Sequence, residues 1–211
     1  MNLLKTLFVG ALALISVTAF AENFNIKYSS NYLMPAYINF NIDNGQYFVE
    51  SKINVPLYNI RFLAKGYMRN NQFNMLNYSD TRNGKAYATA KIDMNNITYG
   101  KVKDQKTETF TLPTMDLFTM AFQLSYYDQL PTSFQITNGK KLYPMENVKI
   151  QKSQKAVERD NGQSVQEITY KFKTGNKDIM VKKHANEKFP RYISYSRDGD
   201  EYELTFDSFV K

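Results

Sequence analysis

The sequence has no cysteine, no tryptophan and only one histidine among its 211 residues. Without cysteine the chain can form no disulfide bridge and offers no thiolate to a metal, so side-chain packing must hold the fold together. A zinc site would have to be built largely from carboxylates, which is unusual. Disulfide-stapled scaffolds and cysteine-ligated metal proteins are therefore excluded, and the sequence predicts no metal site.

Motifs of nucleophilic and cofactor chemistry are also missing. The chain has no G-x-S-x-G elbow, Gly-rich phosphate loop, calcium loop or dinucleotide fingerprint. The single histidine, His184, shares its face of an expected strand with Asp178, Met180 and Lys182. We expect His184 to face solvent as a surface residue and not to act as a catalytic base. The sequence predicts no catalytic residue and no cofactor, and therefore a protein that is not an enzyme.

Paired carboxylates remain as candidates for chemistry, because two of them suffice for glycoside hydrolysis. Asp198, Asp200, Glu201 and Glu203 lie close together in the sequence. Strand alternation points Glu201 and Glu203 outward and leaves Asp198 in a turn. This pattern predicts a solvated sheet edge that discourages association between sheets, and not a catalytic pair.

Long hydrophobic runs are absent after the first 21 residues. Lys5, an apolar stretch that ends near residue 20, and the small residues Ala19 and Ala21 form a secretory signal peptide, with Glu22 as the mature N-terminus. The run from 7 to 20 is shorter than the roughly 20 residues that span a bilayer. We expect cleavage after Ala21, secretion to the periplasm and no transmembrane span afterwards.

The charge balance is basic, with 27 Lys and Arg against 20 Asp and Glu. Loss of Lys5 with the signal peptide lowers the formal net charge from +7 to +6. A basic excess favours anionic envelope material such as lipid head groups or glycans, or it simply keeps the protein in solution. The charges are dispersed and the protein is exported, so we expect no nucleic-acid partner.

Glycine is scarce outside turns, and the turns predict hairpins. Asn-Gly and Asp-Gly supply the positive φ angles that two-residue hairpin loops require. Five such sites occur, Asn44-Gly45, Asn83-Gly84, Asn138-Gly139, Asn161-Gly162 and Asp198-Gly199, and Gly175-Asn176 predicts a sixth turn. The segments between them alternate between apolar and polar residues, as half-buried strands do. Expected strands span 46–55, 58–66, 73–79, 86–92, 97–102, 107–112, 133–137, 145–150, 165–173, 177–183, 191–197 and 200–209.

Two segments stand apart from this alternation. Ala86, Ala88 and Ala90 form a small-residue face on which another element is expected to pack closely. Residues 151–162 are polar and charged, which predicts frayed strand ends and a mobile turn.

One long helix is expected at 114–128, between two prolines that could not lie inside it. Thr114 is the expected N-cap, and Asp116 places negative charge at the positive end of the helix. Leu117, Met120, Ala121 and Leu124 form an apolar stripe, with Thr119 on the least apolar part. Asp116 is the only charged side chain as far as residue 127, so the helix is expected to be covered on most sides by a curled sheet.

Four stretches carry a resemblance to a known family: VPLYNIRFLAKG (Val55–Gly66), SDTRNGKAY (Ser79–Tyr87), DLFTMAFQL (Asp116–Leu124) and TNGKKLYP (Thr137–Pro144). They resemble the bacterial exported proteins of domain-of-unknown-function family 3108, over most of the mature chain. The resemblance implies a β-rich periplasmic protein of a Gram-negative bacterium, built on curved antiparallel sheets. The family has no agreed activity, so it implies no site residue.

The predicted fold is mainly β: a strongly curved antiparallel sheet or two open half-barrels of about a dozen strands, with one buried helix at 114–128. Residues 22–211 are expected to form one domain, or two lobes, 22–112 and 132–211, joined by the helix. The 16 tyrosines and 15 phenylalanines fill the core, and some are expected to line the concave face. The expected function is to bind or carry a hydrophobic or amphipathic envelope component. The alternative is a scaffold or assembly partner of envelope proteins that acts through a sheet edge.

Overall fold

The computed structural model describes residues 21–32, 34–159 and 161–211, so all of the predicted signal peptide except Ala21 lies outside the described residues. The described chain forms sixteen strands and one helix. No described helix is long and apolar enough to cross a membrane. The elements are β1 (Glu22–Ser30), β2 (Ala36–Asp43), β3 (Gln46–Val55), β4 (Tyr58–Arg69), β5 (Gln72–Arg82), β6 (Lys85–Asp93), β7 (Asn96–Lys101), β8 (Asp104–Thr109), β9 (Thr114–Met115), α1 (Leu117–Tyr127), β10 (Phe134–Thr137), β11 (Leu142–Met145), β12 (Gln151–Glu158), β13 (Ser164–Thr174), β14 (Lys177–His184), β15 (Tyr192–Arg197) and β16 (Asp200–Phe209).

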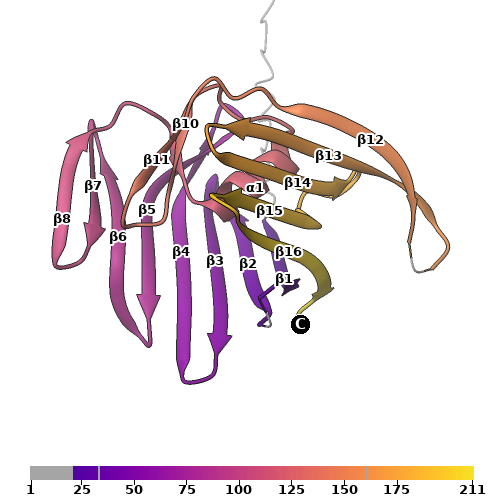
Figure 1. The fold of residues 1–211 in the computed structure, drawn as a ribbon, viewed down its shortest axis with the longest axis horizontal. Helices are drawn as coiled ribbons and strands as arrows, with labels where there is room; N and C mark the ends of the chain where they lie inside the picture. The colour runs from indigo at the N-terminus through magenta and orange to yellow at the C-terminus, as the bar shows by residue number, and fades with distance from the viewer. Residues whose placement is uncertain (1–20, 33, 160) are drawn as a thin grey trace, which may run out of the picture.

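Thirteen of the strands form one antiparallel sheet in the order β12-β13-β14-β15-β16-β1-β2-β3-β4-β5-β6-β7-β8. Consecutive strands are neighbours throughout, except that β16 pairs with β1 in the interior of the sheet. The sheet is open, with β8 and β12 as its outermost strands, and it bends around α1, β10 and β11 (Figure 1). The predicted fold, a large curved antiparallel sheet with one buried helix, is confirmed.

The turn dipeptides lie where the sequence predicts them. All six sites connect consecutive strands, from Asn44-Gly45 between β2 and β3 to Asp198-Gly199 between β15 and β16. Four further turns form without glycine, after β3, β4, β6 and β7. Leu57, Asn70 and Met94 adopt positive φ there, a conformation that carries a steric cost for a leucine or a methionine.

The helix begins three residues later than predicted, at Leu117. The predicted N-cap, Thr114, is wrong because it belongs to β9, which pairs in parallel with β10 and holds it extended. Asp116 is the N-cap instead, and its Oδ1 accepts hydrogen bonds from the backbone N–H groups of Phe118 (2.9 Å) and Thr119 (3.2 Å). A carboxylate at this position satisfies two of the free N–H groups at the start of the helix.

The helix has no polar side. Every residue from Phe118 to Ser125 is buried, including Thr119, whose hydroxyl donates to Asp116. Thr119 lies on the least apolar part of the helix, as predicted, but this part is buried too. Buried Gln123 accepts a hydrogen bond from the N–H of Phe73 in β5 (2.8 Å), which joins the helix to the concave face of the sheet.

The opposite end of the helix is held by a buried cation. Lys183, 4% exposed, donates from Nζ to the carbonyl oxygen of Ser125 (2.7 Å) and forms an ion pair with Asp128 (3.0 Å). A positive charge at the C-terminus of a helix compensates the partial negative charge of its free carbonyl groups. The helix is therefore fixed to the sheet by polar contacts near both ends.

The predicted small-residue face is correct for Ala88 and Ala90, which are buried, but Ala86 is exposed because a bulge in β6 shifts it out of phase. The turn between β10 and β11 lies against this face, so that a Cβ atom added at Gly139 would be 3.0 Å from the ring of Tyr78 and 3.2 Å from the backbone of Ala88. The peptide nitrogen of Gly100 donates to the carbonyl oxygen of Gly139 (2.7 Å). Small side chains on β6 thus allow a short two-stranded hairpin to approach the large sheet closely.

Two segment predictions are wrong, and the sequence predicts no strand at β1 or β2. The expected strand at 145–150 is replaced by β11, which ends at Met145 because its register is set by pairing with β10. Gln151–Glu158, expected to be frayed, forms the regular strand β12 and pairs with β13 over its whole length. Its side chains are almost all exposed because it is an outermost strand, so the sequence lacks the alternation of a half-buried one.

Candidate functional site

A concavity lies between the inner face of the sheet and the first turn of α1. A cavity of about 450 Å³ opens there, which is within the usual size range of small-molecule sites. Its walls are mostly apolar and aromatic. Its apolar and aromatic lining includes Tyr32, Ile53, Phe62, Leu117, Phe118 and Tyr202.

A second apolar hollow of about 630 Å³ adjoins this cavity. The two share Tyr32, Ile53 and Tyr202, and the rings of Tyr32 and Tyr202 stack at 5.8 Å between their centroids. Together they form one apolar surface that is larger than either hollow alone. A surface of this kind suits a chain-like or flat apolar molecule better than a compact polar one.

The inner wall of the cavity carries two polar side chains. Asp116 is 4% exposed, and burial raises its pKa above the ordinary value although the N–H groups of the helix oppose this shift. Tyr78 is 6% exposed, and its pKa is raised by burial and by the nearby carboxylates of Asp116 and Asp80. Since Asp116 serves as the N-cap, the predicted helix-stabilising role of this residue is confirmed.

The mouth of the cavity is polar. Arg197, Asp200 and Glu201 line it together with Tyr143, over whose ring the guanidinium of Arg197 lies at 5.5 Å. Glu201 is exposed, as predicted, whereas Glu203 is half-buried and accepts a hydrogen bond from the hydroxyl of Tyr192. The prediction of a sheet edge is wrong, however, because β16 lies in the interior of the sheet between β15 and β1.

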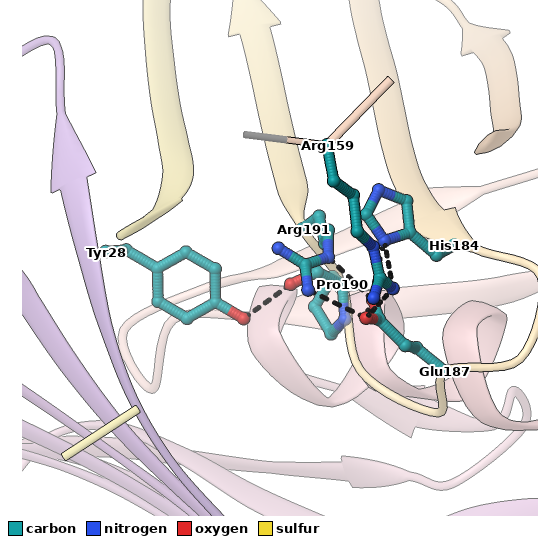
Figure 2. A network of polar contacts seen from close by, with 6 residues as sticks. All are labelled: Tyr28, Arg159, His184, Glu187, Pro190 and Arg191. Carbon is teal, nitrogen blue, oxygen red and sulfur yellow. Dashed lines mark hydrogen bonds and ion pairs between the residues drawn. The ribbon is translucent and has the colours of Figure 1, made fainter. Parts of the chain in front are cut away.

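A separate network of polar side chains surrounds the single histidine (Figure 2). Glu187 is central: its carboxylate accepts two hydrogen bonds from Arg191 (2.7 Å each) and one from Arg159 (3.0 Å). Arg159 also contacts His184 Nδ1 at 3.0 Å. The network connects the end of β12 to the loop between β14 and β15, and Tyr28 is bonded to the same loop through the carbonyl of Pro190 (2.6 Å).

The prediction that His184 faces solvent is wrong, since only 7% of it is exposed. Strand alternation stops at the end of β14, where Lys183 and His184 are both buried. Burial lowers the pKa of His184, as do Arg191 and Arg159, whereas Glu187 opposes the shift. Burial would raise the pKa of Glu187, but the hydrogen bonds and charge of Arg191 outweigh it and lower that pKa.

This network is suited to holding the fold together, because each charged group already has a partner. The carboxylate of Glu187 is paired with two guanidinium groups, and His184 Nδ1 lies 3.0 Å from Arg159 and 3.3 Å from Glu187. No serine or threonine hydroxyl contacts His184 among the hydrogen bonds of the described chain. The described residues also contain no group of three His, Asp or Glu side chains that could hold a metal ion.

Replacing His184 with asparagine should make the protein less sensitive to mild acid. The folded pKa lies below that of the unfolded chain, so the unfolded state takes up the proton first. Stability is therefore complete above about pH 6.5 and falls as the pH drops from there through the folded pKa. Thermal unfolding of both proteins at pH 7.5 and 5.5 tests this, because asparagine offers Arg159 an acceptor but does not titrate. If both proteins lose the same thermal stability between pH 7.5 and 5.5, protonation of His184 is not the cause of the acid sensitivity.

Sequence reasoning missed the cavity because its lining comes from distant segments. Tyr32, Phe62, Phe118 and Tyr202 belong to different elements, and only the curvature of the sheet brings them together. The signal available in the sequence was strand alternation. Tyr202 lies two residues from Leu204, and Phe62 lies two residues from Ala64, so each shares the inner face of its strand with a buried residue. The sequence therefore predicts that aromatic side chains line the concave face, but it does not identify which ones.

Comparison with known proteins identifies no related protein. No family model, no curated protein and no solved structure matches the chain. The resemblance to the exported family 3108 therefore stays a prediction.

Proposed function

We propose that this chain is a periplasmic, non-enzymatic protein that binds or carries a hydrophobic or amphipathic component of the cell envelope. The observation that carries the proposal is the apolar cavity of about 450 Å³ between the curved sheet and the start of α1. Its aromatic walls, the adjoining hollow and the polar mouth match a ligand with a long apolar part and a polar end. The predicted signal peptide is the support for the periplasm.

The alternative, a scaffold that recruits a partner strand, is less well supported. The two outermost strands, β8 and β12, would have to accept the added strand. Both carry exposed and mostly polar side chains, with one lysine in β8 and two in β12, a composition that discourages edge-to-edge pairing. The polar edges therefore favour ligand binding on the inner face over recruitment at an edge.

Leu117→Trp is expected to abolish binding of an apolar probe. Leu117 is half-buried and lines the cavity at the start of α1, so a larger ring there would occupy the space of a ligand. Fluorescence titration with N-phenyl-1-naphthylamine, a neutral apolar dye, should show binding by the wild type. We expect affinity at least about tenfold lower in the variant, which corresponds to roughly 1.4 kcal/mol of binding free energy.

Leu57→Trp is the matched control. Leu57 is fully exposed in the turn between β3 and β4 and does not line the cavity, so this variant should bind the dye like the wild type. Equal affinity in the wild type and Leu117→Trp, with both folded by circular dichroism, would contradict the proposal. So would failure of the wild type to bind the dye. Native mass spectrometry of freshly purified protein gives an independent test, since a carrier should retain a lipid-like adduct.

A further inference from the structure

Three cations converge on one tyrosine ring beside the cavity. The charged groups of Arg82, Lys101 and Lys140 lie 4.7, 5.7 and 5.8 Å from the centre of the Tyr87 ring. All three distances are within the range of cation–π attraction. The cations come from β5, from β7 and from the turn between β10 and β11, so the fold collects them from separate parts of the chain. We call these three cations and Tyr87 the basic cluster.

The positive charge of the basic cluster is only partly compensated. Arg82 forms two hydrogen bonds with the buried carboxylate of Asp80, at 2.8 and 2.9 Å. Lys101 and Lys140 form no ion pair with any described residue, although Asp104 lies opposite Lys101 in the pairing of β7 with β8. Like charges held near one ring repel one another, and an anion between them would relieve that repulsion. The cluster therefore favours an anionic ligand group.

Backbone contacts of the fold hold the cluster in place. Tyr87 is the extra residue of a β-bulge, because Asp80 pairs with Ala88 and the next residue of β5 pairs with Ala86. A bulge redirects a side chain, and here it provides the ring on which the cations stack. The backbone nitrogen of Val102 donates to the carbonyl of Tyr87 (3.0 Å) and holds this position.

The turn that carries Lys140 is held rigidly. Asn138 Oδ1 accepts a hydrogen bond from the N–H of Lys140 (3.1 Å), and Thr137 Oγ1 accepts one from the N–H of Gly139 (3.0 Å). The carbonyl of Gly139 is bound in turn by Gly100 on β7. Rigid placement lowers the entropic cost of binding a ligand through such a turn.

The basic cluster and the cavity are neighbours on the same face of the sheet. Tyr78, Asp80 and Arg82 alternate on one face of β5, and Tyr78 lines the cavity. At roughly 3.3 Å per residue, Arg82 lies about 13 Å along the strand from Tyr78. Asn138 also lines the cavity, two residues from Lys140. An apolar chain of moderate length could therefore occupy the cavity while its charged end reaches the cluster.

We propose that the basic cluster binds the phosphate, sulfate or carboxylate group of an amphipathic molecule whose apolar part occupies the cavity. The inference rests on the proposed function and adds the chemistry of the polar end. It also gives part of the basic net charge a specific role. The polar mouth at Arg197 lies on a different strand, β15, so replacing Lys101 and Lys140 leaves it unchanged.

The test is isothermal titration calorimetry with dodecyl phosphate, below its critical micelle concentration, on the full mature chain. Lys101→Gln combined with Lys140→Gln should weaken binding by about tenfold or more, because two charge-assisted contacts to one anion are lost. Binding of the uncharged 1-O-dodecylglycerol should not change. The pair Lys149→Gln and Lys171→Gln is the control, since both lysines are exposed and the net charge changes equally. Lys101 is exposed and Lys140 half-buried, so the double variant is expected to remain folded.

Equal affinity of the wild type and the Lys101→Gln/Lys140→Gln protein for dodecyl phosphate would overturn the inference. If 1-O-dodecylglycerol still binds and Leu117→Trp still prevents it, the proposed function survives that failure. Inorganic phosphate distinguishes a free anion from a lipid-like one. If the protein binds inorganic phosphate as tightly as dodecyl phosphate, the apolar chain contributes nothing to affinity, and the inference is overturned. If neither amphiphile binds the wild type, both proposals fail.

Discussion

Met120→Asp is expected to unfold the protein or prevent its accumulation. Met120 is completely buried in the main core, on the helix that the sheet surrounds. The variant would bury a carboxylate without a partner, which costs several kcal/mol. That cost is comparable to the whole net stability of a domain, roughly 5–15 kcal/mol. Expression yield and thermal unfolding measure the effect.

Met94→Asp is the matched control, because Met94 is 91% exposed in the turn between β6 and β7. Its positive φ suits aspartate better than methionine, so this variant should be neutral or slightly stabilised. Thr119→Asp is not a mild control, although the sequence suggests one. Thr119 is fully buried beside Asp116, and a second carboxylate there should be nearly as damaging as Met120→Asp. Normal melting of Met120→Asp would exclude α1 from the core.

Gly66→Ala is expected to destabilise the protein by more than about 3 kcal/mol, through overlap with the neighbouring backbone. A Cβ atom at this position would be 1.9 Å from the carbonyl oxygen of Asn74. Gly66 lies at a bulge in the pairing of β4 with β5, where the two backbones approach each other. Backbone atoms cannot move aside as the end of a flexible side chain can. Chemical denaturation measures the loss.

Gly45→Ala separates overlap from backbone conformation. Gly45 has φ of 74°, and a Cβ atom added there would meet no other atom within 4 Å. Alanine at this position therefore costs only the left-handed conformation, roughly 1–2 kcal/mol. Gly66→Ala should lose more stability than Gly45→Ala, although the φ angle of Gly66 is not positive. If the two variants lose equal stability, the close approach at the bulge is not the cause.

The local part of the fold is predictable because hairpins are local. The dipeptides Asn44-Gly45 and Asp198-Gly199 correctly predict turns, and the expected strands 46–55 and 200–209 coincide with β3 and β16. Alternation fails where a strand is not half-buried. β12 is exposed on both faces, and the end of β14 meets the helix and a polar network, so both segments mislead sequence reasoning.

The arrangement of the hairpins cannot be predicted in the same way. Nothing in the residues of β1 specifies β16 as its neighbour, because that pairing depends on shape and burial across the whole sheet. The candidate site depends on the same global features. The basic cluster needs the bulge at Tyr87 and the docking of the turn that carries Lys140, and neither is visible in the spacing of the cations along the sequence.

The pairing of β1 with β16 has a consequence for how the chain folds. Ser29 and Thr205 are register partners although 176 residues separate them, so the interior of the sheet closes only when the final strand is available. Such long-range pairing makes folding slow, since most of the chain must be ordered before this contact forms. Until then β1 and β15 each present an unpaired edge with an apolar face. A chain that stops before Asp200 should therefore aggregate or be degraded, even though every earlier hairpin is intact.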